Sequence, residues 1–480
     1  MNDSATLVWF RLDLRLEDQP ALLAAAQRQS PIIPVFIWAP EEEEPWPPGA
    51  ASRWWLHQSL RALAGDLYSN GLRLILRHGP TLETLKQLLQ ESGASAVYWN
   101  RRYEPAVVAR DEIIRNSLSA GGIEVQTFNA ALLFEPSIIV RKETSQPFQV
   151  FTAFWKACLQ QTAPPCPSSA PRQLLPPKRW PDSVAIEEFQ LEPRLDWAKG
   201  IRATWTPGEA GAKDQLSRFE KENFARYASD RNLPDRTSTS RLSPHLHFGE
   251  ISSRKVWHAL QSLRCQDDAE SVDAYLREVG WREFAHYLLF HFPRSTNEPL
   301  RREFSKFKWR KDDLLLTCWQ QGRTGYPLVD AGMRELWTTG WMHNRVRLVV
   351  ASFLTKHLRI SWEEGAYWFW DTLVDADLAN NTLGWQWSAG SGADAAPYFR
   401  IFNPVLQSEK FDPEGHYIRH WVPELSPLSS PWIHKPWLAP PLVLAEAGVK
   451  LGETYPMPIV NHREARQEAL NAFADCLASK

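Results

Sequence analysis

Two halves with different hydrophobic periods constrain the fold of this 480-residue chain more than any other feature. From residue 6 to about residue 130, short apolar runs alternate with segments whose apolar residues recur at helical spacing. From about residue 205 to residue 480, the strand-like runs disappear and helical patterns dominate. Strands that alternate with helices indicate a parallel sheet with helices on both faces. The sequence therefore predicts an α/β domain followed by an all-α domain.

The first half predicts an open, mostly parallel sheet of five strands. The expected strands are short apolar runs at Leu7–Phe10, Ile32–Trp38, Leu72–Leu76, Ala96–Trp99 and Ile123–Phe128. The expected helices between them cover residues 19–29, 52–69, 81–92 and 104–120. Such a sheet binds ligands beyond the carboxyl ends of its strands. No GxGxxG motif follows the first expected strand, so we do not expect a dinucleotide on this domain.

A proline-rich segment separates the two halves. Residues 159–185 contain seven prolines, too many for a helix or a central strand. We predict an α/β domain at 1–130, an inter-domain linker at 131–205 and a helical domain at 206–480.

Composition narrows the partners and the compartment. The formal charge is −2, so DNA binding requires a local patch; residues 291–310, which include Arg302, carry a net charge of +4. Five widely spaced cysteines without a CxxC pair argue against a disulfide framework and a zinc site, and they fit a reducing cytoplasm. We expect neither a signal peptide nor a membrane span, and therefore a cytoplasmic protein. The 24 tryptophans suggest rings used for stacking, cofactor contact or electron transfer.

Polar clusters in the helical half exceed what packing requires. The segment 237–243 offers hydroxyls, backbone donors and one arginine before a helix, so it is either a phosphate cradle or an N-cap region. A helix at 276–289 places Glu278, Trp281 and Arg282 on one face, as part of a site or as a surface ion pair. Acids and amides at 375–381 either surround an anionic ring system or form a buried salt-bridge network with Arg347.

The order of these motifs resembles the DNA photolyase and cryptochrome family. Six stretches occur in the family's order and spacing: WFRLDLRLEDQPAL, WREF, GRTGYPLVDAGMREL, GWMHNR, DADLANN and GWQWSAG. The similarity extends to DAAPYFRIFNPVLQSEKFD, and WREFAHYLLFHFP is similar to the bacterial subgroup nearest to plant cryptochromes. The resemblance implies an N-terminal antenna domain and a C-terminal FAD-binding domain, with reduced, anionic FAD as the active form. It further implies a monomer that acts on damaged DNA without an obligate protein partner.

The resemblance also implies which residues hold FAD. Asn381 would face flavin N5, where a neutral amide tolerates the anionic ring, and Arg347 would pair with Asp375 over the ring. The matching positions are Tyr227, Thr239, Ser240, Arg241, Leu242, Ser243, Asn344, Arg347, Asp375, Asp377 and Asn381.

The family's catalytic positions match Glu278, Asn344, Asn381, Trp281 and Trp387. Trp281 and Trp387 would stack on a flipped-out cyclobutane pyrimidine dimer. Glu278 would donate to a pyrimidine carbonyl as the transferred electron makes it negative, provided that burial keeps this carboxyl protonated. Enzymes for (6-4) photoproducts carry a His-His pair where this chain has a single histidine before Asn344, so the sequence favours cyclobutane dimers.

Further positions match the family's electron-transfer and DNA-contact residues. The tryptophans Trp385, Trp362 and Trp309 match its electron-transfer chain, or they are core indoles. DNA contacts are expected from Arg231, Arg345 and Arg302, together with Trp281 and Trp387; each arginine could equally be a solvated side chain.

The second chromophore and the exact activity stay open at this point. The antenna chromophore is methenyltetrahydrofolate or 8-hydroxy-5-deazaflavin, and Trp38, Trp54 and Trp55 either stack on it or pack in the core. Pro-Ala-Val follows Tyr103-Glu104, so the folate site of the best-known subgroup is not supported. We expect light-driven repair of cyclobutane pyrimidine dimers; the alternatives are a cryptochrome-type photoreceptor and a photolyase restricted to single strands. Asn381 in place of aspartate, and an end soon after the family core, count against the photoreceptor.

Overall fold

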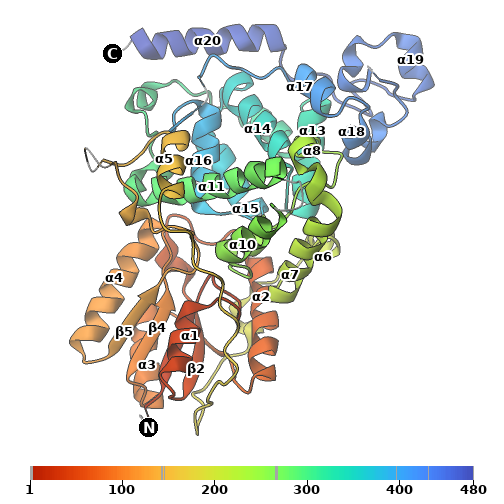
Figure 1. The fold of residues 1–480 in the computed structure, drawn as a ribbon. Coiled ribbons are helices and arrows are strands. Elements are labelled where there is room, and N and C mark those ends of the chain that lie inside the picture. The colour runs from red at the N-terminus through yellow and green to blue at the C-terminus, as the bar shows by residue number, and fades with distance from the viewer. Residues whose placement is uncertain are drawn as a thin grey trace.

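The structure is a computed structural model that describes residues 4–141, 144, 146–264, 269–395, 397–430 and 432–478. An α/β region built from the N-terminal residues lies at one end, and a larger helical region lies on top of it (Figure 1). The predicted fold class, an α/β region followed by an all-α region, is confirmed.

The sheet has five parallel strands in the order β3-β2-β1-β4-β5. Its strands are β1 (Thr6–Phe10), β2 (Ile32–Trp38), β3 (Ile75–His78), β4 (Ala96–Asn100) and β5 (Glu124–Phe128). The central strand β1 pairs Thr6 with Ile32 on one side and with Ala96 on the other.

One predicted strand is displaced along the chain. We expected the third strand to begin at Leu72, but β3 begins at Ile75, which pairs with Val35. The reason is local, because the Leu72 N–H donates to the Leu67 carbonyl (2.9 Å) and so still belongs to the end of the preceding helix.

Helices cover both faces of the sheet because its strands alternate their apolar side chains. Val8 and Phe10 belong to a buried cluster with α1 (Pro20–Gln27) and α2 (Ala50–Ser69). Leu7 and Trp9 point the other way, into a cluster with α3 (Thr81–Ser92) and α4 (Pro105–Ala120).

The helical region follows β5, and the described residues beyond Phe128 contain no further strand. Its first helices are α5 (Phe151–Leu159), α6 (Lys199–Thr204), α7 (Glu209–Arg218), α8 (Tyr227–Asp230), α9 (Ser243–His247), α10 (Ser253–Leu263) and α11 (Ala269–His291). The next are α12 (Asp313–Gln320), α13 (Pro327–Thr339), α14 (Asn344–Ser352), α15 (Trp362–Thr372) and α16 (Leu378–Ala389). The last are α17 (Pro404–Phe411), α18 (His416–Trp421), α19 (Pro441–Glu446) and α20 (His462–Ala478).

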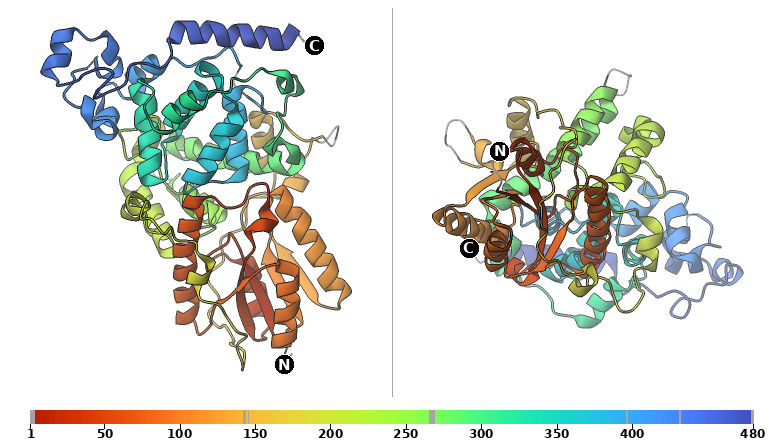
Figure 2. Two further views of the ribbon diagram at one scale, coloured as in Figure 1. Left: turned by 180° about the vertical axis from the view of Figure 1, so that it is seen from behind. Right: turned by 90° about the horizontal axis from the view of Figure 1, so that it is seen from below.

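The helices pack around α11 and α16, which contact each other and lie near the middle of the helical region. Helix α5 packs on α11 and α6 packs on α13, although both lie within the predicted linker. Figure 2 shows α20 across the end of the helical region that is farthest from the sheet. The domain boundaries themselves stay a prediction.

Buried polar contacts fasten the two regions together. The Glu250 carboxylate accepts hydrogen bonds from the Trp55 indole (3.0 Å) and the Gly208 N–H (2.7 Å). Arg15 donates to the Gly249 carbonyl at 2.8 Å. None of the helices within the described ranges is both long enough and apolar enough to cross a membrane.

Candidate functional site

The segment before α9 forms a polar loop held by tyrosines. Arg241 has a left-handed backbone (φ 53°), which turns the loop into the helix. The Ser240 hydroxyl shares a hydrogen bond with the Tyr275 hydroxyl (2.7 Å), and the ring of Tyr227 lies 5.1 Å from that of Tyr275. Burial raises the pKa of Tyr275 to about 12, so its hydroxyl stays protonated at neutral pH.

Buried polar atoms in this loop are left without partners in the protein. The Ser238 hydroxyl and Arg241 Nε are both buried and make no hydrogen bond within the described residues. The Arg241 guanidinium contacts the rings of both Trp205 and Trp341, 4.7 Å from each centroid. Such atoms require a partner, and phosphate oxygens are suitable acceptors.

The remaining predicted loop residues differ in exposure. Ser243 is exposed and accepts a hydrogen bond from the Trp341 indole (3.3 Å), and Thr239 is half-buried. The Leu242 side chain is fully buried in a core cluster, so it anchors the loop through apolar packing.

Two predicted charged residues form a tight pair. Arg347 Nη2 donates to both carboxylate oxygens of Asp375, at 3.1 and 2.8 Å. Arg347 Nε donates to the Met342 carbonyl at 2.7 Å, which fixes the guanidinium. The Asp375 side chain is only 4% exposed, so this pair neutralises a charge that burial alone would not permit.

Asp377 joins a second charged cluster at the start of α16. Its carboxylate lies 3.3 Å from His286 Nε2 and 3.7 Å from His247 Nδ1, and it also caps the helix by accepting the Asn380 N–H (2.8 Å). Burial opposes ionisation of this carboxyl, but the His286 charge and the two histidine hydrogen bonds hold the pKa of Asp377 well below its usual range. For the same reason the pKa of His286 is raised despite burial.

One side of helix α16 borders open space. Gly384 is exposed even though α16 packs against α11, α14 and α15, and a Cβ atom at Gly384 would meet nothing within 4 Å. Asn380, one turn earlier, is exposed as well. Asn381 lies on the same helix and donates to the Ala366 carbonyl of α15 (3.0 Å). Open space beside amides, together with the unpartnered loop atoms, fits a bound flavin nucleotide.

The end of α13 and the start of α14 position Asn344. Asn344 is exposed at the first residue of α14, where His343 Nδ1 accepts the Arg345 N–H (3.2 Å). Burial lowers the pKa of His343 to about 4, so this cap is neutral at pH 7. Glu335 of α13 accepts the His343 N–H (3.2 Å) and the Tyr417 hydroxyl (2.7 Å). We did not predict Glu335, because only the folded chain shows what this carboxylate supports.

The residues expected to meet DNA gather on and beside α11. Arg231 Nη1 lies 2.5 Å from Glu278 Oε1, and the Glu278 side chain is 35% exposed. Trp281 stacks on Phe151 of α5, with centroids 4.0 Å apart and planes at 7°. Trp387 is half-buried on α16, which packs against α11. Glu278 is thus only partly buried, and its ion pair with Arg231 was not predicted.

Two further arginines were predicted to contact DNA. Arg345 Nη2 donates to Asn232 Oδ1 (2.6 Å), and its guanidinium lies 4.5 Å from the Phe411 ring centroid. Arg302 is exposed at the start of a short 3-10 helix, Arg302–Lys306.

The three predicted electron-transfer tryptophans share one hydrophobic cluster. Trp385 and Trp362 are both 2% exposed, and Trp309 packs partly buried against the same cluster. A Cβ atom at Gly365 would lie 2.0 Å from the Trp385 ring, so this indole lies directly against the backbone of α15. Trp319, which we did not predict, makes an edge contact with Trp385, with ring centroids 6.1 Å apart.

A second pocket, of about 690 Å³ and partly open to solvent, lies beyond the carboxyl ends of β1, β2 and β4. This is the position expected for a ligand of a parallel sheet. Its aromatic and charged lining includes Trp9, Arg11, Trp38, Glu43, Arg102, Glu104, Arg110, His247 and Trp370. Trp38 lines the pocket, whereas Trp54 and Trp55 are fully buried in the core.

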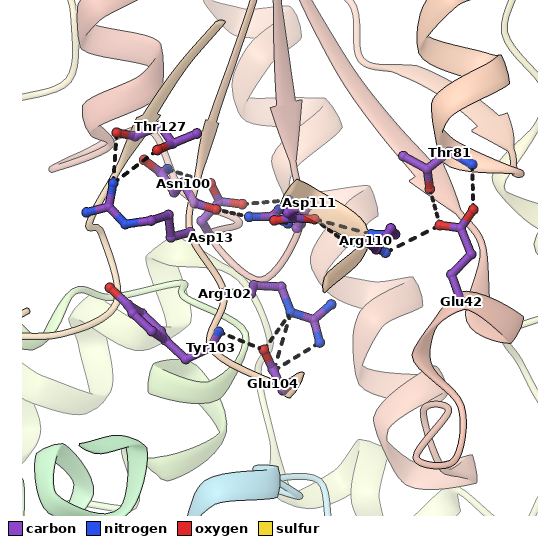
Figure 3. A network of polar contacts seen from close by, with 12 residues as sticks. Asp13, Glu42, Thr81, Asn100, Arg102, Tyr103, Glu104, Arg110, Asp111 and Thr127 are labelled. Atoms are coloured by element: carbon purple, nitrogen blue, oxygen red, sulfur yellow. Dashed lines mark hydrogen bonds and ion pairs between the residues drawn. The ribbon is translucent and has the colours of Figure 1, made fainter. Parts of the chain in front are cut away.

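Ion pairs hold the charged side chains of this second pocket in place. Figure 3 shows Arg102 bonded to Glu104, and Arg110 between Asp111 and Glu42. Arg102 also donates to both carboxylate oxygens of Glu43, at 2.6 and 2.9 Å. Burial opposes ionisation of Glu104, but Arg102 lowers its pKa to about 2.

Two family models match the chain. The one described as DNA photolyase matches residues 6–172, and the one described as the FAD binding domain of DNA photolyase matches residues 275–475. The first spans the α/β region, and the second spans the helices that carry Asp375, Asp377 and Asn381.

Known proteins similar to this chain include both photolyases and cryptochromes. A deoxyribodipyrimidine photo-lyase of Agrobacterium fabrum is 48% identical, with 99% of this chain and 98% of the relative covered. Cryptochrome-1 of Arabidopsis thaliana is 43% identical over 98% of this chain and 70% of the relative. The crystal structure of a bacterial class III photolyase from Agrobacterium tumefaciens superposes with a TM-score of 0.96 at 47% identity, covering 100% of this chain and 98% of the other.

Proposed function

This chain belongs to the DNA photolyase and cryptochrome family, and on that basis we propose that it is a light-driven photolyase that repairs cyclobutane pyrimidine dimers in DNA. The observation that carries the proposal is the packing of α11 against α16. This packing brings the helix of Glu278 and Trp281 to the helix of Asn381 and Trp387, beside the open space at Gly384.

FAD would be held at both of its ends by this chain's own side chains. The polar loop, with Ser238, Ser240 and Arg241, would bind the phosphates, and the Arg347–Asp375 pair would lie against the flavin ring. When bound and reduced, FAD supplies the photoexcited electron that splits the dimer, and the electron then returns to FAD. Asn381 would present an amide rather than an acid to the ring, which avoids placing a second negative charge beside the anionic flavin.

The dimer would be recognised by stacking and by polar contacts. Trp281 is already fixed by its stacking on Phe151, so it offers a rigid ring to an extruded base. Trp387, half-buried on α16, would supply the facing wall. Glu278 and Asn344 would meet the polar edges of the pyrimidines, and Arg231, Arg345 and Arg302 would bind the phosphates.

The second pocket would hold the antenna chromophore. Tryptophans beside fixed arginines suit a flat, anionic ligand. Methenyltetrahydrofolate and 8-hydroxy-5-deazaflavin both meet this description. Trp385, Trp362 and Trp309 would carry electrons to the flavin from the protein surface, as their shared cluster supports.

The rival proposal is a cryptochrome-type photoreceptor, which the 43% identity to a plant cryptochrome keeps in play. The deciding experiment uses purified, reduced protein with a thymine-dimer oligonucleotide, in light and in darkness, on single and double strands. Light-dependent restoration of thymines supports the photolyase, and repair of single strands alone restricts it to them. Absence of repair on both, by protein with a normal flavin spectrum, would favour the photoreceptor.

A further inference from the structure

We propose that the ion pair between Arg231 and Glu278 is a specificity latch, which withholds Arg231 from undamaged DNA and opens when a pyrimidine in the pocket gives Glu278 another partner. The inference rests on the proposed function for the identity of the pocket. It gives these two residues a role in discrimination beyond their proposed contacts with the dimer and the phosphates.

The pair joins two segments at a polar surface. Arg231 follows the last residue of α8, Glu278 lies on α11, and the Nη1–Oε1 distance is 2.5 Å. The side chains are 29% and 35% exposed, so both can be reached from solvent. Burial alone would lower the pKa of Arg231, but the Glu278 carboxylate raises it, which shows how strongly this carboxylate engages the guanidinium. The Arg231 guanidinium also lies over the Tyr227 ring, 5.8 Å from its centroid.

A second arginine, Arg345, lies near the pair and offers a further positive charge to DNA. Burial lowers the pKa of Arg345, the positive charge of Arg231 lowers it further, and the Glu278 carboxylate raises it, so all three groups lie within electrostatic reach of one another. Arg345 is bonded to the neutral Asn232 side chain (2.6 Å). Glu278 therefore pairs directly with one of two neighbouring cations, so the resting protein offers a phosphate one arginine without a direct carboxylate partner instead of two.

The exchange of partners favours damaged DNA. A phosphate can replace a carboxylate on an arginine, with the same charge and a bidentate geometry. On undamaged DNA this exchange leaves the Glu278 carboxylate without its partner. With a dimer in the pocket, a pyrimidine N–H offers the Glu278 carboxylate a new hydrogen bond. The ion pair thus weakens the binding of undamaged DNA more than it weakens the binding of DNA that carries a dimer.

The test is DNA binding in the dark, measured with a fluorescein-labelled, undamaged single strand. Removing the competing carboxylate by Glu278→Gln should tighten binding by about two- to fivefold, the range expected for a partly exposed ion pair. If Arg231 then gains one phosphate contact, the plot of log affinity against log salt concentration should become steeper by about 0.7. The same variant should bind a thymine-dimer strand with less selectivity over the undamaged strand.

Asp230→Asn is the matched control. Asp230 precedes Arg231 in the chain, and its carboxylate accepts the Ser229 hydroxyl (2.7 Å). This substitution removes the same charge from the same surface but leaves the Arg231–Glu278 pair intact. The gain of Glu278→Gln should exceed that of Asp230→Asn at least twofold, and it should vanish in the Arg231→Gln background.

Equal gains in the two variants, no gain, or a gain that persists without Arg231 would each overturn the latch. Because binding of undamaged DNA is measured without light, the result does not depend on repair. Loss of repair activity with a working latch would count against the proposed function alone.

Discussion

At the scale of single residues, Gly384 weakens helix α16 but leaves space beside it for the proposed flavin. Glycine inside a helix is unfavourable, yet here a Cβ atom would meet nothing within 4 Å. No packing constraint of the described protein therefore requires glycine at this position. A glycine at this position is explained if the flavin fills the space that the missing side chain leaves open.

Substituting Gly384 with alanine should therefore have opposite effects on the two properties. Without FAD, Gly384→Ala should raise the free energy of unfolding by about 0.5–1 kcal/mol, because alanine favours the helix. FAD binding should weaken, since the added methyl group would occupy the cofactor's place. Urea unfolding of the apoprotein and flavin content per chain measure the two effects. Full flavin content in the variant would place the ring elsewhere.

Other single residues show what the sequence could and could not predict. The partners Arg347 and Asp375 were predicted together, because the family motifs fix both positions, and the structure pairs them at 2.8 Å. The Arg231–Glu278 pair was missed although both residues were named. They are 47 positions apart, and no periodicity of a single helix joins them.

At the scale of secondary structure, the predictions succeeded where one hydrophobic period runs through an element. The strand Ile32–Trp38 and the helix at 81–92 have the predicted bounds, since both are apolar patterns with clear turn residues beside them. The third strand was misplaced because Leu72 and Leu74 are buried without being paired, and burial alone resembles a strand in the sequence. Long-range packing decides such cases.

The junction of α13, α14 and α18 should give the protein a specific pH dependence. Burial raises the pKa of Glu335 to about 7 from an ordinary value of 4.5. Between these pH values the native protein binds more protons at Glu335 than the unfolded chain does, so the free energy of unfolding should fall as the pH rises toward 7 and then level off. This single group contributes up to about 3 kcal/mol to the fall.

The variant Glu335→Gln removes this titration and keeps an oxygen that can accept the Tyr417 hydroxyl. Its free energy of unfolding should fall less between pH 5 and pH 8 than that of the unmodified protein, as measured by urea unfolding at saturating FAD. Glu446→Gln makes the same change at an exposed position of α19 and should keep the pH dependence of the unmodified protein. Parallel curves for all three proteins would show that Glu335 does not titrate in this range.

At the scale of the whole molecule, the two predicted chromophore sites share a wall. Ala376 and His247 line the second pocket, while the neighbours of Ala376 in the chain are Asp375 and Asp377 of the proposed flavin site. His247 also lies 3.7 Å from the Asp377 carboxylate. A shared wall would keep two bound rings close to each other, which suits the transfer of excitation energy between them.

Trp38→Ala tests this arrangement, because it removes one aromatic wall of the second pocket. The second chromophore should bind at least about fivefold more weakly, as expected for the loss of a stacking ring. The flavin residues lie on the other side of the shared wall, so repair per photon absorbed by the flavin should not change, whereas the action spectrum should lose the chromophore's band. Tyr68→Ala, at an 80% exposed position of α2, is the control. An unchanged chromophore content in Trp38→Ala would move the antenna site away from the carboxyl ends of the strands.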